Sequence, residues 1–308
     1  MEQLAIKGGK PVSNKKIPIA KPIFSEKAIR DVAEVLRSGY VRQGPKCKHF
    51  EEEFKKKVGA KYAYAVNSGT AALHVAYLSI LKPGDEVIVP AFTFIATATT
   101  MVFSFSKPVF ADINEETLTL DPEDVKEKIT SRTRAIAPVH LFGNAADMKA
   151  LGEIAEDHGL YLVNDVAQAH GTEIKGRDVG SLDNLNCYSF YPTKTMTTGE
   201  GGIVTTNDKE LDRRGRLIRS HGQESKYYHT TLGLNYRMTD IMAAIGLNQL
   251  SKLDIYLEKR RRNAKVLTQG LKRMPRVSPQ IARKGVNHSY SYYTVVMNCY
   301  NVHNEASK

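Results

Sequence analysis

Short apolar runs alternate with helical patterns along the first 165 residues. The apolar runs, which predict buried strands, occupy residues 61–66, 86–89, 108–112, 134–139 and 160–164. The helical patterns between them occupy residues 70–80, 96–103, 122–129 and 146–158. This alternation predicts an α/β domain with a mostly parallel central sheet and helices on both faces, because a helix must return the chain before each parallel strand.

Two helices are expected before the first strand. Ser25 is a suitable cap for a helix that ends at Gly39, and a second helix carries Phe50 and Phe54 on one face and ends at Gly59. The apolar stripe of the first helix consists of Ile29, Val32, Ala33 and Leu36.

The rhythm changes after residue 165. Residues 171–186 resemble a hairpin or loop region, and short strands are expected at 187–190, 202–206 and 289–297. Residues 239–273 form one long helical pattern, which is typical of a helix that bridges two domains. We therefore expect a large domain over residues 1–250, whose first 25 residues or so extend towards a small domain over residues 251–308.

Composition and charge leave the predicted fold class unchanged. Of the 308 residues, 42% are hydrophobic and 25% are charged, as in an ordinary globular protein. The net charge of +11 suggests an anionic partner such as a phosphorylated metabolite, a nucleic acid or a membrane surface. Basic runs at 55–57 and 259–262 accompany no zinc-finger spacing or RNP-like aromatic motif, so an anionic metabolite is favoured over nucleic acid.

The cysteines and apolar segments indicate a location. Cys47, Cys187 and Cys299 are sparse and lack metal-binding spacing, which favours a reducing compartment and predicts neither a disulfide framework nor a metal site. No apolar run reaches about 18 residues, so no membrane span is expected. Residues 1–18 lack the apolar core of a secretory signal, and a cytoplasmic location is the expectation.

Two motifs follow predicted strands. Residues 67–73 (NSGTAAL) place Gly69 and Thr70 at a helix start, where free N–H groups can bind a phosphate, although a capped turn explains the same residues. Asp165 follows an apolar strand, at the edge where open α/β sheets bind ligands, and can be a helix cap or the partner of a cationic ring nitrogen. His170 is interpreted first as a packed core histidine.

The strongest motif surrounds a lysine. Ser189 and Lys194 belong to the stretch SFYPTK, in which Ser189 lies within the strand predicted at 187–190 and Lys194 lies just beyond it. A glycine-rich stretch (GEGG) follows at residues 199–202. A serine five residues before a lysine can hold a cofactor phosphate while the lysine forms a Schiff base with its aldehyde. An ordinary surface lysine is the alternative.

Together these motifs resemble the DegT/DnrJ/EryC1/StrS family of pyridoxal 5'-phosphate (PLP) sugar aminotransferases. Further similar stretches are SGYVRQGP at 38–45, PAFTFIA at 90–96, VHLFGN at 139–144 and GLNYRMTDIMAAIG at 233–246. The resemblance implies the PLP-dependent transferase fold of type I. It also implies amino transfer from glutamate or glutamine to a keto sugar, expected to be nucleotide-linked, in the biosynthesis of polysaccharides or secondary metabolites.

The resemblance also implies roles for individual residues. Lys194 would form the Schiff base, Asp165 would pair with the pyridine nitrogen, Gln168 would contact the ring or its 3-hydroxyl oxygen, and Phe94 would stack on the ring. The phosphate would be held by Gly69, Thr70, Ser189 and the backbone N–H of Ala71. Asn235 would reach the phosphate in a partner subunit, which implies a homodimer with shared active sites. Sugar dehydratases of the family carry histidine in place of Lys194, so the lysine favours an aminotransferase.

The C-terminal part departs from the family pattern. Family members usually run well past this length, residues 287–297 still resemble their Tyr-rich strand, and residues 298–308 match nothing expected. The small domain is therefore expected to be shortened, and a catalytically impaired PLP-binding homologue is the alternative to an active enzyme. A nucleic-acid-binding protein is the other alternative, motivated by the net charge alone.

Overall fold

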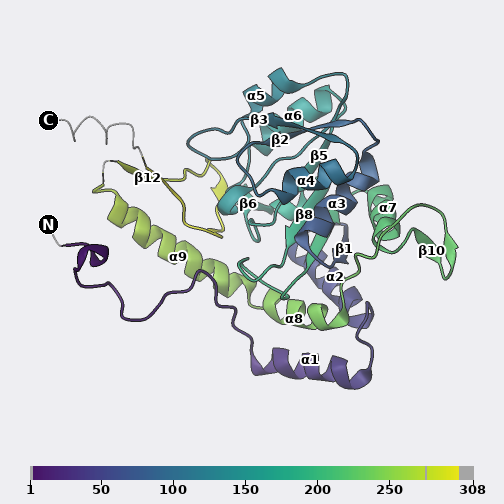
Figure 1. The fold of residues 1–308 in the computed structure, drawn as a ribbon, viewed down its shortest axis with the longest axis horizontal. Helices are drawn as coiled ribbons and strands as arrows, with labels where there is room; N and C mark the ends of the chain where they lie inside the picture. The colour runs from purple at the N-terminus through teal and green to yellow at the C-terminus, as the bar shows by residue number, and fades with distance from the viewer. Residues whose placement is uncertain (1–2, 275, 298–308) are drawn as a thin grey trace.

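The computed structural model describes residues 3–274 and 276–297. Its centre is a seven-stranded sheet in the order β1-β9-β8-β5-β4-β2-β3 (Figure 1). The strands are β1 (Tyr62–Val66), β2 (Glu86–Pro90), β3 (Lys107–Ala111), β4 (Thr133–Ile136), β5 (Tyr161–Asp165), β8 (Leu185–Ser189) and β9 (Gly202–Thr206). Only β9 runs against its neighbours in this sheet, and the pairs among β8, β5, β4, β2 and β3 are parallel. The predicted mostly parallel α/β sheet is confirmed.

Helices cover both faces of the sheet, because alternate side chains of each strand point to opposite faces. On one face α3 (Gly69–Ile80), α4 (Ala96–Phe103) and α7 (Lys209–Arg219) share a buried cluster with Tyr64 and Val66 of β1. On the other face α2 (Pro45–Val58) and α8 (Asp240–Leu250) pack with Ala63 and Ala65. The same face carries α5 (Pro122–Lys128) and α6 (Met148–Asp157), which pack over β2 and β4.

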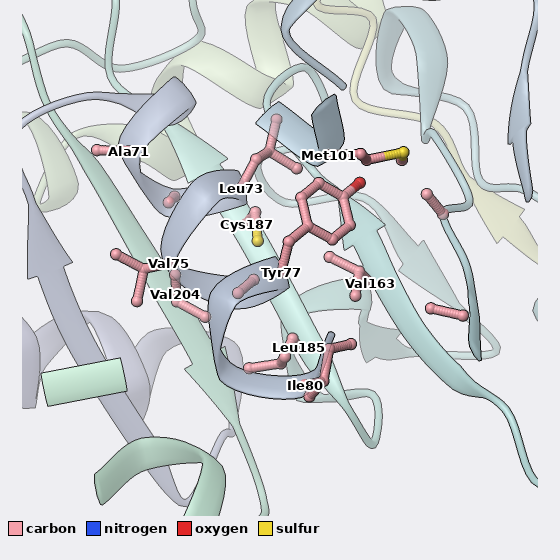
Figure 2. Close-up of a cluster of buried hydrophobic side chains, with 14 of the residues drawn as sticks. Ala71, Leu73, Val75, Tyr77, Ile80, Met101, Val163, Leu185, Cys187 and Val204 are labelled. Carbon is pink, nitrogen blue, oxygen red and sulfur yellow. The ribbon is translucent and has the colours of Figure 1, made fainter. Parts of the chain in front are cut away.

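Helix α3 lies across the centre of the sheet. Figure 2 shows Tyr77 of α3 among Val163 of β5 and Leu185 and Cys187 of β8. Apolar residues on all sides of α3 suit a helix that is buried between the sheet and its neighbouring helices. This packing fixes the first turn of α3 at the edge of the sheet where the parallel strands end.

The first helix matches its predicted boundaries but not its predicted buried face. Helix α1 (Glu26–Ser38) is capped by the Ser25 hydroxyl, which accepts from the Ala28 N–H at 3.3 Å, and Gly39 ends it with φ of 72°. However, Ile29 and Leu36 of the predicted stripe are each 55% exposed. The buried positions are Ala28 and Val35, and the helix packs against α8.

Two further predictions were wrong in detail. The long pattern at 239–273 is two helices, α8 and α9 (Leu253–Leu271), because Ser251 ends α8 and its hydroxyl donates to the Asn248 carbonyl at 2.9 Å. The strand predicted at 289–297 is reduced to β14 (Val295–Met297). The sequence pattern also missed α7 and the hairpin of β10 (Gln223–Ser225) and β11 (Tyr228–His229).

Short elements tie the end of the described chain to the large sheet domain. Strand β13 (Val286–Asn287) pairs with β6 (Glu173–Ile174) of the predicted hairpin, whose second strand is β7 (Arg177–Asp178). Strand β12 (Val277–Pro279) pairs with β14. Single 3₁₀ turns occur at Ala5–Lys7, Leu141–Gly143 and Val179–Ser181. The distinctive residues 298–308, with Cys299, lie outside the described residues.

Within the part of the chain that the structure describes, no helix is both long enough and apolar enough to cross a bilayer.

Candidate active site

The carboxyl ends of the strands surround a cavity of about 390 Å³. Asp165 is the last residue of β5, Ser189 is the last residue of β8, and Gly69 begins the helix that follows β1. Because parallel strands end at the same edge, residues from distant parts of the chain meet here. Of the residues singled out in the sequence, the cavity is lined by Gly69, Thr70, Phe94, Asp165, Gln168, Ser189 and Lys194.

Gly69 and Ser189 form a cradle for an anion at the first turn of α3. A Cβ on Gly69 would lie 2.5 Å from the Ser189 Cβ, so this position requires glycine for steric reasons. The first N–H groups of a helix have no acceptor within the helix, and those of Gly69 and Thr70 therefore suit a phosphate. Ala71 differs from its expected role, since its N–H already donates to the Ser68 hydroxyl at 3.0 Å and caps the helix.

Asp165 is a buried carboxylate held by two hydrogen bonds. It is 6% exposed and accepts from the Thr97 hydroxyl at 2.8 Å and from the Ala167 N–H at 3.0 Å. Burial raises the pKa of Asp165, while both hydrogen bonds and the nearby positive charge of Lys194 act in the opposite direction. A cationic group placed at this carboxylate would favour its charged form further.

Thr97 was missed by the sequence analysis. It lies on α4, is fully buried and bonds both Asp165 and Thr93, whose hydroxyl is 2.9 Å away. The sequence did contain a signal for Thr97, because this residue directly follows the PAFTFIA stretch at 90–96, which resembles the family. Phe94 lies just before this helix, and its carbonyl accepts from the Thr97 N–H at 3.1 Å.

Lys194 lies on the loop between β8 and β9. The loop is anchored at Phe190, whose carbonyl accepts from the Thr197 hydroxyl at 2.7 Å and from the Thr198 N–H at 3.0 Å. Burial lowers the pKa of the Lys194 amine, and attraction to Asp165 opposes this shift. A lysine amine with a lowered pKa can lose its proton more readily and act as a nucleophile or base.

Gln168 and Phe94 lie where a planar ring would have to fit. The Gln168 Oε1 accepts from the Phe142 N–H at 2.8 Å, which leaves its amide NH₂ to donate to an oxygen in the cavity. Phe94 lines the cavity and is 67% exposed, so an apolar face is available for stacking. Tyr292, from the C-terminal segment, lines the same cavity and was not singled out from the sequence.

His170 and Asn235 lie outside this cavity. His170 is buried, with the rings of Tyr188 and Phe190 at centroid distances of 5.2 and 5.7 Å. Burial lowers the pKa of His170 to about 3, so it is neutral near pH 7, as expected of a packed core histidine. Asn235 is exposed and does not contribute to the cavity of its own chain.

These residues fit PLP by the chemistry of the groups present. A glycine-lined cradle at a helix start suits its phosphate, a buried carboxylate suits its ring nitrogen, and a partly buried lysine suits its aldehyde. All three groups face one cavity.

The DegT/DnrJ/EryC1/StrS aminotransferase family matches residues 22–306. The chain belongs to this family. The GDP-perosamine synthase of Escherichia coli O157:H7 is 38% identical over 283 residues, which are 90% of this chain and 76% of that protein. The spore coat polysaccharide biosynthesis protein SpsC of Bacillus subtilis (strain 168) is 38% identical over 292 residues, 91% of this chain and 75% of that protein. The solved structure of S. venezuelae DesV aligns with a TM-score of 0.86 at 38% identity, over 91% of this chain and 77% of that chain.

Family membership and fold agree with each other. The chain is a PLP-dependent aminotransferase, and its sheet is that of the type I fold of PLP-dependent transferases. The antiparallel direction of β9 determines where the loop that carries Lys194 lies. Because β8 returns as β9 without a crossover helix, the loop that carries Lys194 stays at the carboxyl edge, next to Asp165.

Proposed function

We propose that this aminotransferase moves an amino group from glutamate or glutamine to a nucleotide-linked keto sugar in polysaccharide or secondary-metabolite biosynthesis. The observation that carries the reaction type is the convergence of Lys194, Asp165 and the cradle of Gly69 and Ser189 on one cavity. The sugar class is supported by relatives named as a GDP-perosamine synthase and a spore coat polysaccharide biosynthesis protein.

The chain would supply positioning and proton transfer. When bound, PLP provides an aldehyde for the lysine and a ring that withdraws electrons from the donor. Asp165 would keep a proton on the ring nitrogen, and Gln168 would donate to the ring oxygen. Lys194 would hold the cofactor through its aldehyde, and its amine would move a proton between Cα of the donor and C4′ of the cofactor.

We also propose a cytoplasmic homodimer in which the partner subunit's Asn235 reaches the cofactor phosphate. Its exposure outside the cavity of its own chain supports this role, and exposed Leu232 and Leu234 beside it offer apolar surface. Mixing inactive Lys194→Ala and Asn235→Ala proteins should restore part of the activity, since a mixed dimer contains one site without either substitution. Activity no greater than the sum of the separate variants would contradict shared sites.

The division of the chain into a cofactor-binding domain over residues 1–250 and a small domain over residues 251–308 is part of the same proposal. The break between α8 and α9 at residues 251–252 supports this boundary.

The decisive experiment separates the two half-reactions. PLP-loaded protein is incubated with glutamate or glutamine, and conversion of the yellow cofactor to pyridoxamine phosphate is followed by absorbance. The aminated form is then offered a panel of nucleotide-linked keto sugars, with mass detection of the product. No conversion by either donor would identify a catalytically impaired homologue instead.

A further inference from the structure

The C-terminal segment at residues 280–292 returns to the rim of the cofactor cavity. Figure 1 shows this segment, in yellow, running back from β12 towards β6, with which β13 pairs. His288, Ser289 and Ser291 of the segment are buried, and Tyr292 lines the cavity. The segment is therefore packed into the surroundings of the cofactor site.

The segment is joined to the turn at Leu141–Gly143, whose first residue also lines the cavity. The Ser289 N–H donates to the Gly143 carbonyl at 3.1 Å. The Tyr292 N–H donates to the Phe142 carbonyl at 3.3 Å. A Cβ on Gly143 would overlap the Ser289 Oγ, so glycine is what allows the two backbones to approach this closely.

Phe142, in this turn, has a backbone conformation that phenylalanine rarely adopts. Its φ of 62° and ψ of 3° lie in the left-handed region, where a bulky side chain is uncommon. Such conformations persist where the surroundings fix them, and they cluster at functional sites. The Phe142 ring packs edge-on against the rings of Phe92 and Tyr292, at centroid distances of 6.1 and 6.2 Å. The C-terminal segment thus supplies both a backbone donor and a ring that hold Phe142 in place.

The conformation of Phe142 determines which end of the Gln168 amide faces the cavity. The Phe142 N–H donates to the Gln168 Oε1 at 2.8 Å, so the NH₂ group is the end left for the cavity. If this N–H turned away, the amide could rotate and present its oxygen, which would repel an anionic oxygen of a bound ring. The donor at Gln168 therefore depends on the turn.

Thr172 joins the turn to the C-terminal segment through one side chain. It is fully buried, and its hydroxyl donates to the Gly143 carbonyl at 2.7 Å. The Ser289 hydroxyl lies 2.9 Å from the same oxygen. Thr172 follows Gln168 by four residues, so one short stretch of chain contacts the turn at two successive peptide groups.

Helix α9 fixes the other side of the segment. The Arg260 Nη1 donates to the carbonyls of Tyr290 and Ser291 at 3.1 and 2.9 Å. The Arg261 Nε donates to the His288 carbonyl at 3.1 Å. Hydrogen bonds from charged donors are the stronger ones, so the segment is held firmly between α9 and the turn.

On the basis of the proposed contact between Gln168 and the ring oxygen of the cofactor, we infer that the C-terminal segment is a positioning element for this contact. The segment holds the turn, the Phe142 N–H holds the amide oxygen of Gln168, and the NH₂ group faces the ring oxygen. Thr172 and Ser289 are positioning residues, since neither lines the cofactor cavity. Besides forming part of the cavity wall, the segment thereby influences the acid–base behaviour of the bound cofactor.

The test follows the absorbance of the PLP-loaded protein against pH, with neither amino donor nor sugar present. An amide donor stabilises the ring oxygen as an anion, so its loss should raise the pH at which the bound cofactor gives up its proton. Gln168→Ala is the direct reference. Its titration midpoint should rise by about one pH unit, the size expected of a hydrogen bond to a charged group.

Thr172→Val removes the hydroxyl and keeps the shape of the side chain. Its midpoint should rise by about 0.3 to 0.5 pH units, because a loosened turn weakens the Gln168 contact without deleting it. The double variant should match Gln168→Ala, since both changes act on one donor. The matched control is Thr205→Val, a fully buried threonine whose hydroxyl also donates to a glycine carbonyl, that of Gly180, at 2.7 Å. Its midpoint should equal that of the wild type.

Amide hydrogen exchange of residues 139–144 gives a second measurement, which does not depend on the cofactor. Ser289→Ala removes a smaller part of the same contact and keeps the test open should Thr172→Val fail to fold. Both variants should exchange about two- to fivefold faster than the wild type in this stretch, within the range of one neutral hydrogen bond. Thr205→Val should leave this exchange unchanged.

Several results would overturn the inference. A shift in Gln168→Ala without one in Thr172→Val or Ser289→Ala would leave Gln168 acting alone. Additive shifts in the double variant, or an equal shift in Thr205→Val, would point to general packing. No shift in Gln168→Ala would remove the contact that the segment is inferred to position.

Failure of this inference is distinguishable from failure of the proposed function. Protein that converts its cofactor with glutamate but shows none of these shifts is an aminotransferase without this positioning element. Protein whose cofactor titrates as expected in every variant, but is not converted by glutamate or glutamine, has the positioning element without the proposed activity.

Discussion

The two cavities that meet at Lys194 are built from different kinds of structure. The cofactor cavity is formed by the ends of β5 and β8 and the first turn of α3, all of which are fixed by the buried core. A second cavity, of about 360 Å³, is lined by residues 19–23, the lysine loop and one face of α9, and Ile19 and Ile23 of this segment are 89% and 69% exposed. A sheet edge therefore places the reacting groups rigidly, whereas a lightly anchored segment contributes to the neighbouring site.

Removal of the Lys194 amine, in the rigid cofactor cavity, should have the largest effect on activity. We expect Lys194→Ala to bind PLP through its other contacts and to lose kcat by more than about 10⁴-fold, because general acid–base catalysis alone contributes about 10²–10⁴. Lys194→Arg is the matched control. It keeps the charge but lacks a titratable amine, and should be equally inactive.

Borohydride reduction followed by peptide mapping gives an independent measurement of the same residue. The pyridoxyl group should be found on Lys194, and its attachment to another lysine would contradict the assignment.

Filling the phosphate cradle should come next in size. A methyl group at residue 69 would lie 2.5 Å from the Ser189 Cβ, so Gly69→Ala should weaken PLP affinity by about 10- to 100-fold, as expected when an anion loses close backbone donors. Gly152→Ala on α6 is the control, since a methyl group there would meet no atom within 4 Å. Equal PLP affinity of the two variants in a fluorescence titration would argue against the cradle.

Loss of the hydrogen bond to Asp165 should have a smaller effect with a defined sign. Thr97→Val removes a donor that favours the charged carboxylate, so the pKa of Asp165, already raised by burial, should rise further. The acidic limb of the kcat/KM profile should move to higher pH by about one unit, the size expected of a hydrogen bond to a charged group.

Thr100→Val is the control for this change, because Thr100 is also buried on α4 but donates to the Ala96 carbonyl at 2.8 Å. Its pH profile should match that of the wild type. A shift of the same size in both variants would point to altered packing of α4 and not to Asp165.

The smallest expected effect concerns the lightly anchored segment at residues 19–23. Gln249→Leu removes the hydrogen bond to the Ile23 carbonyl and frees the segment at residues 19–23. The backbone amides of residues 19–24 should exchange their hydrogens about two- to fivefold faster, within the range of one neutral hydrogen bond, while PLP affinity should stay the same. Unchanged exchange in this segment, or a loss of PLP affinity, would show that the two cavities are not separately supported.

The sequence was sufficient to predict the elements and the site residues wherever the local pattern of apolar residues agrees with the fold. The alternation of strands and helices predicted the parallel sheet, and the positions of Gly69, Asp165 and Lys194 just after predicted strands placed them at one edge. It was less informative for α7, whose residues are mostly charged and whose burial depends on Leu211 and Ile218 packing on the sheet.

What the sequence by itself determined is the class of reaction, because the residue types that would hold PLP occur in motifs at or just after the ends of predicted strands. Only the tertiary structure decided what supports them. Thr97 reaches Asp165 from a helix 68 positions earlier in the chain, and Tyr292 joins the cavity from the C-terminal segment. One face of α9, with Tyr256, Lys259, Arg260 and Asn263, likewise becomes a cavity wall only because residues 19–23 pass beside it. Such contacts depend on long-range packing, which periodicity along the chain does not encode.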